Sequence, residues 1–214
     1  MEPNHTMEPK TTPRPRNPRG TGDRLRDEIL IAAEELLRDM PGEALTLRAV
    51  ARAAGITAPS IYRHFIDREA IIRAVVDRAF DELERTLDLA AAGLRGGDRL
   101  SAICAAYLAF ATDRPQRYRV MFGGVWNAAE SDGASVGDLQ ERAQIGQRPF
   151  LILVEAVREV AAIGESNSTD PVADAAAVWV GLHGIASLRQ TTPLFPWPSD
   201  IEKRLVHNLA LLRD

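Results

Sequence analysis

Hydrophobic positions along most of the chain recur at helical spacing. Leu25, Ile29, Ala32 and Leu36 follow one another at intervals of three or four residues, which places them on one face of a helix. The same spacing returns in later segments, whereas the strict alternation of a half-buried strand is rare. We therefore expect an all-α protein with about nine helices.

Residues that start and stop helices divide this pattern. A first helix is expected from Gly22 to the "MPG" at 40–42, and a short helix from Thr46 to about residue 54. Gly55 ends the short helix, Thr57 begins another, and Asp67 begins a long helix that reaches residue 92.

The part of the chain after Gly93 predicts a second, larger helical body. Pro149 is expected to kink or split a helix over residues 139–163. Asp170 and Pro171 begin a further helix, and "SDIE" at 199–202 predicts a capping box that opens the last one, with Ser199 as N-cap and Glu202 at N3.

The stretch from Thr46 to Phe65 is typical of a helix-turn-helix, in which two short helices meet at a turn that contains glycine. Gly55 supplies a left-handed backbone, and Val50, Ile56 and Ile61 are spaced to fill the wedge between the helices. The second helix then exposes small and polar residues, which suit a DNA major groove: Thr57, Ala58, Ser60, Tyr62, Arg63 and His64.

Composition changes this picture only in detail. The chain has 214 residues, of which 45% are hydrophobic and 26% charged, ordinary values for a globular protein. The single Cys104 excludes an internal disulfide framework and favours a reducing cytoplasm. The apolar segment 171–188 contains Asp174 and His183 and many small residues, so we expect a helix at a subunit interface rather than a membrane span.

Charge is distributed unevenly along the chain. The net charge is −4, but residues 1–26 carry six basic and three acidic side chains, a net charge of +3, which leaves −7 for the remainder. Residues 1–20 also contain five prolines and no apolar periodicity, so they predict a disordered basic arm. Residues 21–70 hold seven basic and nine acidic side chains, so helix N-termini and a few well-placed cations must carry any phosphate binding there.

The segment "LTLRAVARAAGITAPSIYRHFIDREAII" resembles the DNA-binding domain of the tetracycline-repressor (TetR) family of bacterial regulators. In addition, "YRVMFGG" and "VWVGLHGIASL" are similar to a C-terminal subtype known by its Trp-His-Gly motif. The resemblance implies a basic arm at 1–20, a helix-turn-helix domain at 21–66, a connecting helix at 67–92, and an effector-binding and dimerisation domain at 93–214.

The resemblance also implies roles for residues near the helix-turn-helix. Ala58, Pro59 and Ser60 would face the bases, and Arg48 would face the groove. Thr46, Tyr62, His64 and Arg68 would contact phosphates. The alternatives are that Tyr62 and His64 serve packing and capping, and that Arg63 is a solvated charge.

Two stripes on the last long helices predict a dimer interface in the form of a four-helix bundle. They consist of Ala177, Gly181, Gly184 and Leu188, and of Ile201, Leu205, Leu209 and Leu212. The alternative for these stripes is packing within one chain.

An effector pocket is predicted where aromatic side chains converge on the helix after Pro171. Its candidates are Tyr107, Phe110, Met121, Phe122, Trp126, Phe150, Trp179 and His183. Each of them alone is also explained as a core residue, and His183 as a core histidine with satisfied hydrogen bonds.

These features predict a cytoplasmic bacterial repressor that binds a palindromic operator in double-stranded DNA as a homodimer and is released by a small apolar or amphipathic ligand. We expect no enzyme, cofactor, metal or membrane partner, because no catalytic motif is present and the four histidines lack ligand spacing. The alternative is an architectural or orphan DNA-binding helical dimer without an effector.

The basic arm generates a first prediction. Deletion of residues 1–20 should weaken DNA binding to all sequences and flatten the dependence of log affinity on log salt, because Arg14, Arg16 and Arg19 would no longer displace counterions. Titrations of full-length and truncated protein at several salt concentrations measure this. An unchanged slope would show that the arm makes no phosphate contact.

Overall fold

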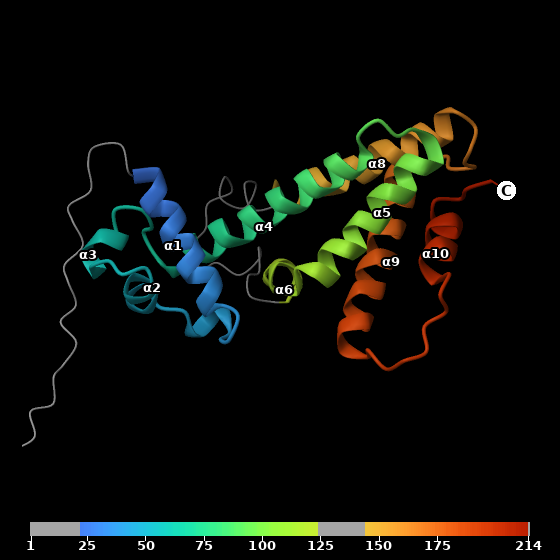
Figure 1. The fold of residues 1–214 in the computed structure, drawn as a ribbon. Helices are drawn as coiled ribbons and strands as arrows, with labels where there is room; N and C mark the ends of the chain where they lie inside the picture. The colour runs from blue at the N-terminus through green and yellow to red at the C-terminus, as the bar shows by residue number, and fades with distance from the viewer. Residues whose placement is uncertain (1–21, 124–143, 214) are drawn as a thin grey trace, which may run out of the picture.

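The structure, a computed structural model, describes residues 22–123 and 144–213. Within these residues it contains nine α-helices and no strand beyond one isolated bridge between Ser166 and Leu212, so the all-α prediction is confirmed. Figure 1 shows α1–α3 at one end of the molecule and α8–α10 at the other, with α4 running between them. The helices are α1 (Gly22–Leu36), α2 (Leu47–Ala53), α3 (Ala58–Ile61), α4 (Arg68–Ala91), α5 (Gly96–Asp113), α6 (Pro115–Phe122), α8 (Gln147–Ala162), α9 (Pro171–Thr191) and α10 (Ile201–Leu209).

Two hydrophobic cores correspond to the two ends of the molecule. The smaller core joins α1, α2, α3 and the first half of α4, where Ile71 and Val76 are fully or almost fully buried. The larger core joins the second half of α4, from Ala79 to Ala91, to α5, α6, α8, α9 and α10. One continuous helix therefore contributes to both cores.

Side-chain caps fix several of the predicted helix starts. Thr46 accepts a hydrogen bond from the Ala49 amide at 3.1 Å, and Asp67 accepts one from the Ala70 amide at 2.7 Å. Asp170 caps α9 in the same way. Each cap satisfies a backbone N–H that the helix itself leaves without an acceptor.

The predicted capping box at Ser199–Glu202 is wrong. α10 begins at Ile201, and its N-cap is Asp200, which makes no side-chain bond to the helix amides. The Asp200 carboxylate accepts a hydrogen bond from Arg204 at 2.6 Å, and Glu202 pairs with Arg189 of α9. The pair with Arg189 takes up the Glu202 carboxylate that the capping box would need.

The chain breaks before Pro149 rather than at it. Pro149 lies in the first turn of α8, where a missing N–H costs nothing. The break is at Gly146, whose φ is 81° and whose place for a Cβ lies 2.8 Å from the Phe80 ring. Only glycine fits both the backbone and this close approach. Residues 139–143 of the predicted helix lie outside the described residues.

The caps generate a second prediction. Asp67→Ala should lower the free energy of unfolding by about 1 kcal/mol, because the Ala70 amide loses its acceptor. The matched control is Asp200→Ala, which removes an N-cap aspartate that bonds no amide and should lose much less. Denaturant unfolding followed by circular dichroism measures both. Equal losses would show that the Asp67 cap contributes nothing.

Candidate DNA-binding surface and effector pocket

The helix-turn-helix is formed by α2, α3 and the turn between them. Gly55 has a φ of 66°, and the Ile56 amide donates to the Ala51 carbonyl at 2.9 Å, which closes α2. Val50 and Ile61 are fully buried between the helices, and Ile56 packs beside them. The wedge predicted from the sequence is therefore present.

The residues predicted to face DNA all lie on the surface of this unit. Thr46, Arg48, Thr57, Pro59, Tyr62, Arg63 and Arg68 are exposed, and Ala58, Ser60 and His64 are partly exposed. Tyr62 has 60% of its surface exposed. α3 lies at the end of the molecule away from α9 and α10, so no other described part of the chain covers it (Figure 1).

Four polar side chains of this surface already have partners within the chain. The hydroxyls of Thr57 and Ser60 are 2.8 Å apart, so a base contact by Ser60 would compete with this bond. Arg68 donates to the Glu43 carbonyl at 2.7 Å, which orients its guanidinium at the start of α4. Thr46 uses its oxygen as a cap and keeps its hydroxyl proton for another acceptor.

Charges are segregated across the small domain. Glu34 pairs with Arg117, Glu28 pairs with Arg24, and the Asp67 carboxylate caps α4. In contrast, Arg48, Arg52 and Arg63 are exposed and form no ion pair among the described residues. The helix-turn-helix therefore presents uncompensated positive charge, although acidic side chains outnumber basic ones in residues 21–70.

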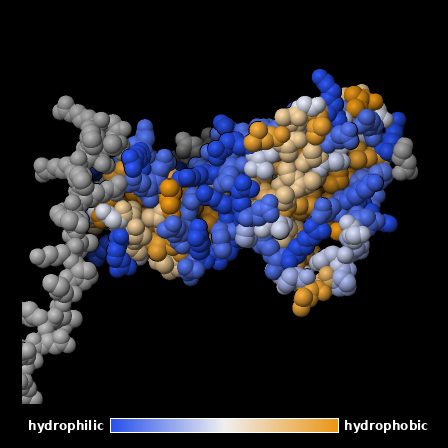
Figure 2. Space-filling view, in the orientation of Figure 1, coloured by the Kyte–Doolittle hydropathy of each residue, from blue (hydrophilic) through white to orange (hydrophobic). Residues whose placement is uncertain are grey.

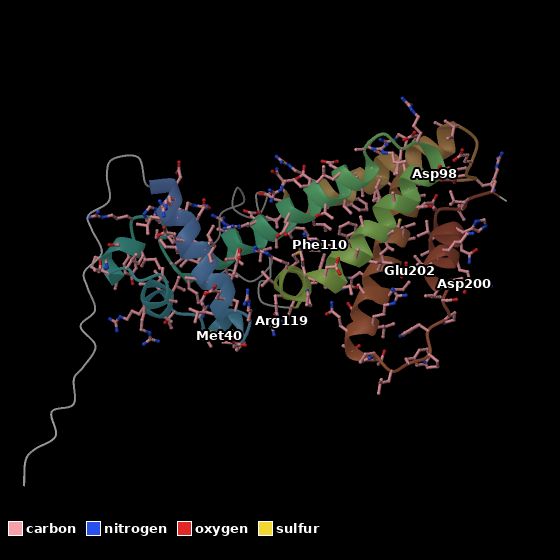
Figure 3. All side chains as sticks on the ribbon, viewed as in Figure 1. Met40, Asp98, Phe110, Arg119, Asp200 and Glu202 are labelled. Atoms are coloured by element: carbon pink, nitrogen blue, oxygen red, sulfur yellow. The ribbon has the colours of Figure 1, made fainter. Side chains whose placement is uncertain are left out.

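α6 connects the two ends of the molecule. Arg119 donates to the carbonyls of Leu37, at 2.6 Å, and of Arg38, and so caps the end of α1. In Figure 3 Arg119 lies beside the end of α1, close to Met40. Arg117 pairs with Glu34 of α1, and with Glu82 of α4 at 3.1 Å.

The other face of α6 belongs to the larger core. Tyr118 is buried there, and Phe122 packs against it, with ring centroids 4.9 Å apart. Both rings also lie against His183 of α9, with centroids 5.6 and 4.7 Å from the imidazole. A displacement of these rings would therefore be transmitted through α6 to the contacts with α1.

An aromatic cavity of about 310 Å³ lies where α4, α6, α8 and α9 meet. It is lined by Phe80, Phe122, Ile145, Gly146, Gln147, Phe150 and Trp179. A larger hollow of about 490 Å³ shares Phe80, Ile145 and Gly146 with it and has a charged rim that includes Arg73, Asp77 and Arg148. An apolar chamber therefore adjoins a polar one.

The predicted pocket residues are only partly brought together. Phe122, Phe150 and Trp179 line the cavity, and His183 contacts Phe122. Tyr107, Phe110 and Met121 are buried core residues that line neither chamber, and Trp126 lies outside the described residues. The sequence analysis missed Phe80 and Tyr118, although Tyr118 stands inside the "YRVMFGG" motif.

A chain of polar groups runs along one side of the aromatic cluster. The hydroxyls of Tyr107 and Tyr118 are 3.2 Å apart, and the Tyr118 hydroxyl is 2.6 Å from Nδ1 of His183. When Tyr118 donates to Nδ1, the proton of the neutral imidazole lies on Nε2, 3.5 Å from the Ser187 hydroxyl. Burial lowers the pKa of His183, so the neutral ring that this chain requires is favoured.

The exposed face of α9 is apolar and carries no charge. We call Ala173, Ala177, Val180, Gly184 and Leu188 the α9 stripe; Val180 has 69% of its surface exposed, and nothing lies within 4 Å of where a Cβ of Gly184 would be. Among the described residues, α9 is also the one helix that is long and apolar enough to span a membrane. Only 28% of its most apolar stretch of 18 residues is buried in the protein, so much of this apolar surface is exposed. Such an exposed apolar face marks an interaction site.

The residues predicted for the same interface on α10 and just after it also pack within the chain. Ile201, Leu205, Leu209 and Leu212 lie against the larger core. Gly181 faces them, because a Cβ there would lie 2.8 Å from Leu205 and 2.9 Å from Leu209. Packing within one chain therefore accounts for Gly181. The side chains of the α10 stripe stay partly exposed, so their place in a dimer interface stays a prediction.

Two family models match the chain. One, described as "Tetracyclin repressor-like, C-terminal domain", matches residues 100–212, and the other, "Bacterial regulatory proteins, tetR family", matches residues 29–75. The first alone covers more than half of the 214 residues.

Similar proteins agree with these models. The HTH-type transcriptional regulator EthR of Mycobacterium tuberculosis is 32% identical over 84 residues, so the chain spans about two fifths of its length, 39% of each protein. The HTH-type transcriptional regulator Rv1816 of the same species is 22% identical over 194 residues, 79% of this chain and 82% of that one. A solved structure of a protein of unknown function from Rhodococcus sp. RHA1 has a TM-score of 0.72 and 27% identity, and the match covers 88% of this chain and 96% of that one.

The buried histidine generates a third prediction. The pKa of His183 is lowered in the folded protein, so the unfolded chain takes up its proton first, near pH 6.5. The stability that the neutral ring contributes is present above that pH and is lost as the pH falls through the folded pKa. His183→Gln should therefore show a smaller fall in unfolding midpoint between about pH 7 and 5 than the unaltered protein.

His207→Gln is the control, because His207 lies on α10 outside the aromatic cluster and its replacement should keep the full pH dependence. If His183→Gln lost as much stability on acidification as the unaltered protein, the histidine would not couple protonation to folding.

Proposed function

The chain belongs to the TetR family of bacterial regulatory proteins, and on that premise we propose that it is a sequence-specific DNA-binding transcriptional repressor. It would bind a palindromic operator as a homodimer in the bacterial cytoplasm and leave it when a small ligand binds. The observation that carries the proposal is the exposed helix-turn-helix, with a small-residue face on α3 and three uncompensated arginines around it.

DNA recognition follows from the chemistry of this surface. Ala58 can contact a thymine methyl, and Ser60 can exchange its bond to Thr57 for a bond to a base edge. Tyr62, His64, Thr46 and Arg68 surround these residues and would hold the phosphates. Small base-facing side chains leave part of the specificity to DNA shape.

Dimerisation is supported by the α9 stripe. Pairing of two stripes would bury apolar surface that is otherwise in water, and Gly184 would let the two helices approach closely. A two-fold dimer sets two recognition helices about 34 Å apart, one turn of DNA, and so matches a palindrome.

The effector would occupy the aromatic cavity. Four rings around about 310 Å³ suit a small apolar body, and the adjoining charged hollow suits one polar group. The ligand class is therefore a small apolar or amphipathic molecule. The relatives named above are transcriptional regulators, and we propose no enzymatic activity for this chain.

Release would follow from the two helices that reach both ends of the molecule. A ligand that displaces Phe122 or Tyr118 moves α6, and Arg119 then pulls on the end of α1. A ligand against Phe80 acts on α4 directly. To release DNA, the ligand must bind the displaced state better, with a coupling of about 1–3 kcal/mol.

The alternative function is that of an architectural or orphan DNA-binding dimer without an effector. It predicts weak sequence preference and no release by any ligand. The aromatic cavity and the charged hollow beside it favour an effector-controlled regulator.

Selection of sites from random duplex DNA by the full chain tests the function and gives a fourth prediction. An inverted repeat should be enriched at physiological salt, where non-specific binding is weak. Tyr62→Phe should then weaken binding to the operator and to unrelated DNA by the same factor, about three- to tenfold, because it removes a phosphate hydrogen bond and no base contact. Ser60→Ala should instead change the enriched sequence. Failure to enrich any sequence with folded protein would reject the repressor and favour the architectural alternative.

The α9 stripe gives a fifth prediction. Val180→Arg should convert the dimer to a monomer, because it places a charge in the middle of an apolar interface. Leu89→Arg is the control, since Leu89 on α4 is 78% exposed and lies outside the stripe. Sedimentation equilibrium measures both. A Val180→Arg protein that remains dimeric would move the interface away from α9.

A further inference from the structure

A second hollow lies between α5 and α10, and it shares no lining residue with the aromatic cavity or its neighbour. Its volume is about 300 Å³. It is lined by Ser101, Cys104, Ala105 and Leu108 of α5, by Glu202, Lys203, Val206 and His207 of α10, and by Leu212. We call it the α5–α10 groove. On the face seen in Figure 2 an apolar area lies over α5, with polar residues on the side of α10.

The floor of the groove is apolar. Cys104, Leu108 and Val206 are nearly fully buried at its base, and Ala105 and Leu212 form its walls. Burial raises the pKa of the Cys104 thiol to about 12, so it stays neutral and acts as a small hydrophobic group. A polar molecule would gain little on this floor, whereas an alkyl chain or ring would be removed from water.

The rim of the groove carries one cation in excess. Lys203 forms no ion pair among the described residues; the nearby Asp200 is already paired with Arg204, which lowers its pKa with some help from Lys203. The one acid on the rim, Glu202, is neutralised by Arg189 of α9. An anion would therefore meet a net positive rim above an apolar floor.

We propose that the α5–α10 groove binds a small amphipathic carboxylate, with its head at Lys203 and its apolar part against Cys104, Leu108 and Val206. A volume of about 300 Å³ is at the lower end of the range for ligand cavities, which suits a medium-length chain or a single substituted ring. This site is separate from the effector cavity and does not depend on the repressor proposal.

The surface around the groove does not suit a second copy of the chain. Lys203, Arg204 and Asn208 are exposed on the outer side of α10, and charged residues are depleted in the cores of protein interfaces. The uncharged α9 stripe is the surface that suits a second copy.

The test uses octanoate as the probe and octan-1-ol as the uncharged control of the same length, with the full chain. Calorimetry gives the affinity, and the rate at which iodoacetamide modifies the single Cys104, followed by intact mass, reports the place of binding. Octanoate should bind with one site and slow the modification of Cys104 at least threefold. Lys203→Gln should weaken octanoate binding at least threefold and leave octanol unchanged, and Lys203→Arg should restore it.

A matched pair of alanines on α5 separates the groove from the rest of the protein. Ala105 lines the groove and Ala109, one turn further, does not; both are exposed, so either tryptophan variant should fold. Ala105→Trp should fill the groove and abolish octanoate binding, whereas Ala109→Trp should bind as the unaltered protein does.

Three results would overturn the proposal. The first is that octanoate does not bind. The second is that octanoate binds but still binds to Ala105→Trp and leaves the rate of Cys104 modification unchanged. The third is that Cys104 becomes protected as the protein concentration rises, without octanoate. The second would place octanoate in the aromatic cavity, and the third would place a second copy on the groove. Site selection on DNA is unaffected by any of them, so the two proposals fail separately.

Discussion

The sharing of α4 between two hydrophobic cores is the constraint on which the rest of the molecule depends. The helix is 24 residues long, which makes it a rod of about 36 Å, and it has no described break. Its first half is held by α1 and the helix-turn-helix, and its second half by α5 and α8. Because close-packed cores do not deform continuously, a tilt imposed at one end must appear at the other. The cap at Asp67 places this rod directly after the recognition turn.

α6 is a second link between the two ends of the molecule. Together, α4 and α6 restrict the direction in which one end can move relative to the other. Its arginines hold α1 and α4, Phe122 lines the aromatic cavity, and Tyr118 packs behind Phe122 in the larger core. Glu34 is pinched between Arg117 and Arg78 with only 15% of its side chain exposed. Separating Glu34 from its arginines would leave a largely buried charge without a partner, which costs free energy. We therefore expect α1–α3 to move as a rigid body that keeps its contacts with α6 and α4. Under the proposed function, a ligand at the rings would rotate the recognition helices through these two links.

How much could be predicted depended on the distance in sequence over which each feature is determined. The turn at Gly55 and the caps at Thr46 and Asp67 are set by residues three or four positions apart, and the sequence predicted them. The pair Tyr118–His183 spans 65 positions, and no periodicity reports it. Helical spacing also does not say which neighbour covers an apolar face. The stripe of Leu205 and Leu209 fits the dimer prediction and the intrachain alternative equally, and only the structure shows that Gly181 packs against these leucines within the chain.

The electrostatics of the small domain shows why placement matters more than totals. By count residues 21–70 are acidic, which argues against a nucleic-acid binder. In the structure Glu34 and Glu28 are paired and Asp67 is a cap, whereas Arg48, Arg52 and Arg63 remain unpaired on the helix-turn-helix. The field that a phosphate meets is set by nearby charges within about 10 Å, because salt screens those further away. Glu34 therefore stabilises the contact of α1 with α6 and α4, and positive charge is left where DNA would lie. One sequence thus supports an acidic protein and a local anion-binding surface at once.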